Sequence, residues 1–284
     1  MMTVDLTSPA FHRALLGALC VSFGSAPIGV FLVLRRMSLI GDVIAHAILP
    51  GTAAAFIMYG FSLAAMSVGG VIAGLAVALA AGVVTRVTAL REDASLAAFY
   101  LIAVAAGVMM LALHGSAQNL EDVLFGNAQS LTPDAVWMMT GTCAVTIVTM
   151  LAIYRPLVVE SFDPVFLRSV GGRGGLVHAV FIGLAVLNMV ESYRAMGTLM
   201  SAGLMLIPAI SAQFWTRNLR MMIAVAVGIA AVSSISGLVV AMGAHVPPGP
   251  AIILIAGAIY LFSLCLGRFG SVRAKYFPAR HLAH

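Results

Sequence analysis

Nine long apolar runs, separated by short polar segments, limit what this chain can fold into. A helix needs about 20 mainly apolar residues to cross the roughly 30 Å of hydrocarbon in a bilayer, and most of these runs supply them. The runs are continuously apolar rather than alternating, and every backbone polar group must be paired within lipid, so helices are the expected spanning form. The runs cover residues 14–34, 38–59, 63–84, 94–113, 135–153, 176–190, 195–214, 221–242 and 250–267.

We therefore predict an all-α, polytopic membrane protein with about nine transmembrane helices. The run 176–190 is short and could be tilted, re-entrant or half-buried in protein, so eight spans is the alternative. Composition excludes a water-soluble domain, because 62% of the residues are hydrophobic and only 9% are charged. A soluble domain carries about 25% charged residues. Residues 1–284 are expected to form a single membrane domain, and the first run is too long for a cleavable signal peptide.

The basic residues sort to one side of the predicted membrane. With Arg35 and Arg36 in the cytoplasm and nine alternating spans, only Arg13 and Arg194 of the 15 Lys and Arg residues fall outside, which leaves 13 inside. The positive-inside rule then predicts an outer N-terminus and a cytoplasmic C-terminus, and it favours nine spans over eight. The basic residues form no stripe and are not interleaved with aromatics, so nucleic-acid binding is not expected despite the net charge of +5.

Asp42 is the one acidic residue that falls well inside a predicted span, and His46 follows four residues later. A charged side chain near the bilayer centre costs about 2.5–3.5 kcal/mol, so it should face a partner or an aqueous path. Residues i and i+4 lie on one helical face, so this carboxylate and this imidazole can point into the same space. We interpret the pair as an oxygen and nitrogen site for a divalent cation, with a structural Asp–His hydrogen bond as the alternative.

Pro50 and Gly51 follow in the same run and predict a helix kink beside this site. Pro50 lacks the N–H that would reach the carbonyl of His46, and its ring pushes that carbonyl aside. One chain supplies too few ligands for zinc, which takes about four, or for manganese, which takes more. A twofold dimer with two copies of Asp42 and His46 around its axis would supply four ligands, so dimerisation follows from the ligand count.

A cytoplasmic segment between the fifth and sixth runs carries the signals of a short helix. Asp163 suits the N-cap, Pro164 suits the first helical position, and Gly171 suits the helix end. An isolated helix of about two turns is marginal, so its apolar face is expected to dock on the chain's own spans or on another subunit. The side chains of that face are Phe166, Leu167 and Val170.

The remaining titratable residues are weaker candidates. Glu191 and Arg194 stand close together on the predicted outer side, where an ion pair is favoured over a role in the entrance. His178, near an inner span end, and His245, near an outer one, are interpreted as interfacial histidines rather than ligands.

The stretch Ser38-Leu-Ile-Gly-Asp42-Val-Ile-Ala-His46-Ala-Ile-Leu-Pro50-Gly51 resembles the Ser-Leu-x-Gly-Asp-(x)3-His-(x)3-Pro-Gly signature of permeases from zinc, manganese and iron-type ABC importers. The resemblance covers nearly the whole chain. Two departures are Ala45, where that family often has Ser, and His245, in a region where an acidic residue often precedes the late proline motif. Supporting stretches are residues 124–127, 162–164, 204–209 and 247–254.

The resemblance implies a type II ABC importer permease that moves a divalent metal ion into the bacterial cytoplasm across the inner membrane. The ion would be zinc or manganese, with iron as a further candidate, and Asp42 and His46 would line its path. No permanently bound cofactor is implied. The implied partners are an ABC ATPase subunit, an extracytoplasmic metal-binding protein and a second copy of this chain. The residues that would couple to the ATPase are Asp163, Pro164, Phe166, Leu167, Arg168 and Gly171.

Two other functions compete with this interpretation. A proton-coupled secondary transporter would also use an intramembrane Asp and His, but it needs neither a docking helix nor an ATPase. An intramembrane metalloenzyme is disfavoured because the chain has no His-Glu-x-x-His motif. The chain also has no Gly-(x)4-Gly-Lys-Ser/Thr loop, so ATP hydrolysis is expected from a separate subunit and not from this chain.

Overall fold

The computed structural model of the chain describes residues 8–37, 39–60, 62–88, 92–114, 131–196, 198–244 and 246–273. Within these ranges the regular structure is α-helical, as the continuously apolar runs predict. The helices are α1 (Pro9–Leu34), α2 (Leu39–Ala47), α3 (Leu49–Tyr59), α4 (Leu63–Val87), α5 (Glu92–His114), α7 (Pro133–Phe162), α8 (Pro164–Ser169), α9 (Gly174–Met196), α10 (Thr198–Gln213), α11 (Leu219–Ala244) and α12 (Pro248–Leu266).

Among the described residues, six helices are long and apolar enough to cross a membrane, and three further apolar stretches are shorter. The six are α1, α4, α7, α9, α11 and α12, and the shorter stretches are Val43–Tyr59, Ala94–Met110 and Met200–Gln213. The apolar run 176–190, expected to be short, lies inside the 23 residues of α9. Much of α9 is buried in the protein, because it packs against α1, α4, α7 and α10.

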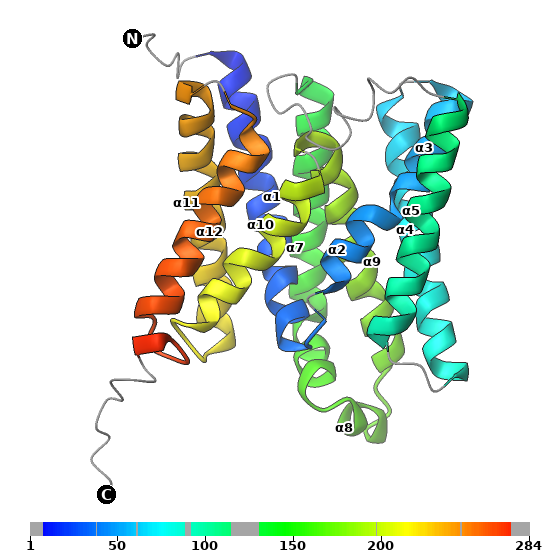
Figure 1. Cartoon of the computed structure of the whole chain (residues 1–284). Coiled ribbons are helices and arrows are strands. Elements are labelled where there is room, and N and C mark those ends of the chain that lie inside the picture. Colours follow the sequence, from blue (N-terminus) through cyan, green and yellow to red (C-terminus); the bar gives the residue numbers. More distant parts are fainter. Residues whose placement is uncertain are drawn as a thin grey trace, which may run out of the picture.

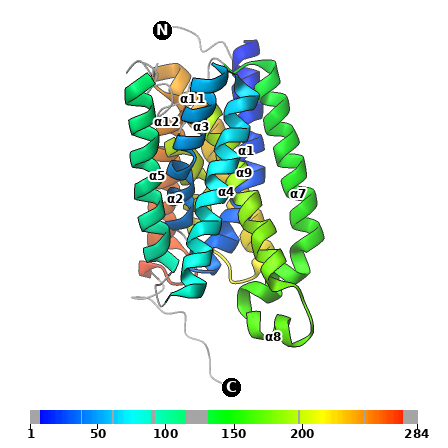
Figure 2. The ribbon, with the colours of Figure 1, turned by 90° about the vertical axis from the view of Figure 1, so that its right-hand side faces the viewer.

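The long helices stand side by side and alternate in direction along the chain (Figure 1). α1, α4, α7, α10 and α12 run one way, and α2–α3, α5, α9 and α11 run the other. α1 is central and packs against α7, α9, α10 and α11, whereas α3, α4 and α5 pack against one another at one side. The short helix α8 extends beyond the ends of the other helices, as both views show (Figures 1 and 2).

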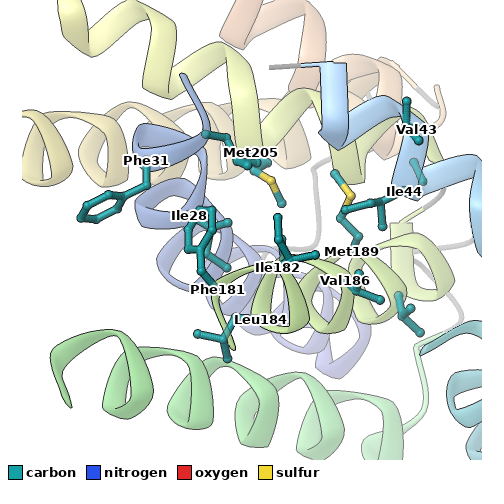
Figure 3. Close-up of a cluster of buried hydrophobic side chains, with 14 of the residues drawn as sticks. Ile28, Phe31, Val43, Ile44, Phe181, Ile182, Leu184, Val186, Met189 and Met205 are labelled. Carbon is teal, nitrogen blue, oxygen red and sulfur yellow. The ribbon is translucent and has the colours of Figure 1, made fainter. Parts of the chain in front are cut away.

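The centre of the bundle is filled by large apolar side chains from four helices (Figure 3). The rings of Phe31 on α1 and Phe181 on α9 meet edge to face, with centroids 6.1 Å apart and an angle of 66° between planes. Lipid tails are as apolar as these side chains, so close packing rather than exclusion of water selects this arrangement. The other labelled members are Ile28, Val43, Ile44, Ile182, Leu184, Val186, Met189 and Met205.

Glycines allow α4 to approach its neighbours closely. A Cβ added to Gly70 would lie 2.8 Å from Ile48 Cγ2, and one added to Gly74 would lie 2.8 Å from Val186 Cγ1. Gly70 and Gly74 therefore permit close helix packing.

Large apolar side chains cover the outside of the bundle. Leu79 on α4 is 62% exposed, Leu151 on α7 is 71% exposed and Leu254 on α12 is 74% exposed. A water-soluble monomer rarely presents so continuous an apolar surface. This surface is suited to lipid and to partner subunits within the membrane.

Candidate metal path and coupling segment

His46 lies on the last turn of α2 and faces α5. Its side chain is half-buried, and its ring centroid lies 5.4 Å from that of Tyr100, with 49° between the ring planes. Tyr100 was not predicted to lie at this site. The available signal was a polar aromatic residue in the middle of the apolar run 94–113, but nothing local indicates that this ring meets His46.

Asp42 lies on α2 four residues before His46, which is the spacing that puts two side chains on one helical face. The side chain of Asp42 lies outside the described part of the structure, so its joint role with His46 stays a prediction. Among the described side chains, no group of three or more His, Cys, Asp or Glu residues is arranged to hold a metal.

The helix that carries this pair is interrupted at Ile48. α2 ends at Ala47, and α3 begins at Leu49 with Pro50 in its first turn. Hydrogen bonding resumes with the N–H of Thr52, which donates to the carbonyl of Ile48 at 3.1 Å. Pro50 removes the donor that an uninterrupted helix would direct at the carbonyl of His46.

Neighbouring glycines hold this interruption on two sides. On α5, a Cβ added to Gly107 would lie 2.9 Å from Leu49 Cβ and 3.0 Å from Pro50 N. On α4, Gly69 packs directly against Gly51, whose added Cβ would collide with the Gly69 carbonyl. Gly51 thus has a packing role in addition to its position next to the proline.

Glu191 was predicted to lie on the outer side near Arg194, but it lies inside α9 and is only 7% exposed. One of its carboxylate oxygens accepts a hydrogen bond from the Ser67 hydroxyl of α4 at 3.0 Å. The side chain of Arg194 lies outside the described residues, so the predicted ion pair between the two stays a prediction. His245 and residues 124–127 also lie outside the described part of the chain.

The segment predicted at 163–171 forms the helix α8, Pro164–Ser169. The Asp163 carboxylate caps it by accepting a hydrogen bond from the Phe166 N–H at 2.8 Å. The helix ends where Gly171 takes a φ of +75° and the Gly172 N–H donates to the Leu167 carbonyl at 2.8 Å. The capping residues therefore act as the sequence predicts.

The apolar side chains of α8 divide between two directions. Phe166 is 53% exposed and Val170 is 61% exposed, whereas Leu167 is only 8% exposed. Leu167 therefore packs on its own chain, and the predicted docking face is reduced to Phe166 and Val170 together with Val165. The side chains of Pro164 and Arg168 lie outside the described residues.

The chain is thus a bundle of apolar helices with one interrupted helix, α2–α3, and a capped helix, α8, beyond one end. The chain belongs to the ABC 3 transport family, whose model matches residues 8–267. It is therefore the membrane-embedded permease of an ABC transporter.

Named relatives and a solved structure cover nearly the whole chain. The manganese transport system membrane protein MntC of Listeria innocua is 31% identical over 253 residues, which is 89% of either protein. The zinc transport system membrane protein TroC of Treponema pallidum is 30% identical over 265 residues, which is 90% of this chain and 88% of TroC. A chain of PsaBC from Streptococcus pneumoniae, solved in complex with Fab, superposes with a TM-score of 0.85 at 25% identity, covering 95% of this chain and 96% of that one.

Proposed function

We propose that this chain imports a divalent metal ion, manganese or zinc with iron as a further candidate, into the bacterial cytoplasm. The observation that carries the proposal is α2, where Asp42 and His46 stand one turn apart on a helix that is interrupted at Ile48. Relatives named for manganese and for zinc transport support a divalent cation as cargo. A carboxylate and an imidazole suit either metal, so the pair does not distinguish between them.

The working permease is proposed to be a homodimer. Asp42 and His46 provide two side-chain ligands per chain, which is too few for either metal. Two chains related by a twofold axis provide four ligands from identical helices. A site with four adjustable ligands also suits a transporter, because the ion must leave as well as bind.

Two further partners complete the proposed assembly. An ABC ATPase supplies hydrolysis, since this chain lacks the Gly-(x)4-Gly-Lys-Ser/Thr loop. The ATPase is proposed to dock on α8, which extends beyond the bundle (Figure 1) and carries the exposed Phe166, with the exposed Val170 just after it. An extracytoplasmic metal-binding protein delivers the ion on the opposite side.

The chain is proposed to cross the membrane nine times, with its N-terminus outside. The six long helices, the three shorter apolar stretches and the alternating directions of successive helices support this count. Basic residues support the orientation: Arg35 follows α1, Arg173 follows α8, and Arg217 and Arg268 follow α10 and α12, all at the end of the bundle where α8 lies. α8 is therefore assigned to the cytoplasm.

Uptake of manganese and zinc by the reconstituted complex in proteoliposomes tests the function. Asp42→Asn keeps the size of the side chain and removes its charge, so uptake should fall at least about tenfold, as expected for a lost charge-assisted contact of ~1.4 kcal/mol or more. Asp134→Asn is the matched control, because Asp134 is an exposed carboxylate in the first turn of α7. Full uptake by well-inserted Asp42→Asn would remove the metal-path assignment. Uptake without ATP would favour a secondary transporter.

A further inference from the structure

Arg35 ends α1 and extends its side chain to two other helices. Its Nε donates a hydrogen bond to the Ser161 hydroxyl of α7 at 2.9 Å. Its Nη1 lies 3.0 Å from Nδ1 of His178 on α9, and its guanidinium carbon lies 5.0 Å from the centre of the Phe181 ring. One side chain therefore joins α1, α7 and α9. From the sequence, His178 was predicted to be an interfacial residue only.

The chemistry of the donors fixes how these groups are oriented. A guanidinium can only donate, so the ring nitrogen Nδ1 of His178 is the acceptor of this hydrogen bond. The Ser161 hydroxyl donates to the Leu157 carbonyl at 2.6 Å, so its lone pairs are left to accept from Arg35. The ring of Phe181 provides a face for the cation. Ser161 and His178 are thus oriented to accept hydrogen bonds from Arg35, and Phe181 to stack against its guanidinium.

The two hydrogen-bond partners bracket the coupling segment. Ser161 lies two residues before Asp163, the residue that caps α8, and His178 lies on the first turns of α9, just after α8. The Glu160 carboxylate packs against Gly174, the first residue of α9, so closely that an added Cβ there would collide with it. The end of α7 and the start of α9, the two segments that flank α8, are therefore in contact next to the partners of Arg35.

The main chain of Arg35 continues towards α2, the helix that carries Asp42 and His46. Its N–H donates to the Phe31 carbonyl at 3.0 Å and closes α1. Arg36 then takes a φ of +59°, and the Met37 N–H donates to the Leu32 carbonyl at 2.9 Å, two residues before α2 begins. Residues 35–37 thus form a hydrogen-bonded turn, and Ser38, between this turn and α2, lies outside the described residues.

We propose that Arg35 couples the ATPase-driven displacement of α8 to α2, the helix of Asp42 and His46. This inference rests on the proposed function and assigns to it a positioning residue that does not touch the ion. When α8 moves, the end of α7 and the start of α9 move with it, and they carry Ser161 and His178. Arg35 follows because its guanidinium is bonded to both, and its backbone passes the displacement to the start of α2.

The test is the number of metal ions imported per ATP hydrolysed by the reconstituted permease–ATPase complex. Arg35→Gln removes the guanidinium that bonds both Ser161 and His178. It should lower this ratio about 5- to 150-fold, which is the effect of a typical coupling free energy. ATPase binding and ATP hydrolysis should persist. Arg36→Gln is the matched control, because it removes the same charge from the neighbouring exposed residue and should keep the wild-type ratio.

Substitutions of His178 test the link without changing Arg35. His178→Leu removes the acceptor and should lower the ratio, whereas His178→Gln offers an amide oxygen to the guanidinium and should restore most of it. A wild-type ratio in both Arg35→Gln and His178→Leu overturns the proposal. A parallel loss of uptake and ATP hydrolysis overturns it too, because that is the signature of a structural role. If Arg35→Gln does not insert, the two His178 variants decide. Failure of the wild-type complex to couple uptake to ATP would instead refute the proposed function.

Discussion

Replacing Phe166 by Asp should break the contact between the permease and its ATPase. Phe166 is 53% exposed, so a docked ATPase can bury about half of the surface of this side chain. Full burial of a Phe side chain contributes about 1.5–3 kcal/mol, and half of that is about 1 kcal/mol. An unpaired carboxylate in the same interface adds a desolvation cost of about 1–3 kcal/mol. The sum is about 2–4 kcal/mol, or a roughly 30- to 700-fold rise in Kd.

The permease itself should tolerate this change. Phe166 is the third residue of α8, where a negative charge interacts favourably with the helix N-terminus. Gly175→Asp is the matched control, because it adds the same charge at an exposed position of α9 where a Cβ meets nothing within 4 Å. Binding of the detergent-solubilised permease to immobilised ATPase measures Kd for both. A Kd for Phe166→Asp within about threefold of the wild-type value, with normal uptake, would refute the docking assignment.

Three further outcomes are expected. Gly107→Leu should lower the free energy of unfolding by about 1–3 kcal/mol, because its side chain would overlap Leu49 at the helix interruption. Gly228→Leu on α11, where an added Cβ meets nothing within 4 Å, should not lower it. Equal melting temperatures of the two variants in detergent would contradict this prediction. Tyr193→Phe should be neutral or stabilising by up to about 1 kcal/mol, because the buried Tyr193 hydroxyl has no hydrogen-bond partner among the described residues; marked destabilisation would mean that the hydroxyl is bonded. In a cysteine-free background, membrane-impermeant maleimide should label Asp134→Cys from outside and not Ser169→Cys, and the reverse pattern would invert the topology.

Local signals in the sequence predicted the helices and the ends of α8. Within the described residues, each apolar run falls mainly on one helix or on the α2–α3 pair, because helix formation in lipid depends on properties of the run itself. Asp163 and Gly171 act as predicted for the same reason, since an N-cap and a left-handed glycine work within a few residues. The run 176–190 was underestimated because Glu191 and Tyr193 interrupt the apolar pattern while remaining buried.

Contacts between distant segments could not be predicted in this way. Tyr100 lies beside His46 only because α5 packs against α2. Leu167 was grouped with Phe166 on one apolar face, yet the return of the chain into α9 buries the first and exposes the second. The bonds from Arg35 to Ser161 and His178 span 126 and 143 residues of sequence, and no local spacing indicates them.

The glycine contacts at Ile48 hold α3 more tightly than α2, the two halves of the interrupted helix. α3 packs against α4 through Gly51 and Gly69, and α5 packs against Leu49 and Pro50 through Gly107, with no room for even a methyl group. Backbones in such contact cannot slide past each other without collision, so α3, α4 and α5 should move together as one rigid body. Ile48 then serves as the pivot. Opening toward the cytoplasm would swing α2 while the outer part of the path keeps its shape, so His46, two residues from the pivot, should move less than Asp42.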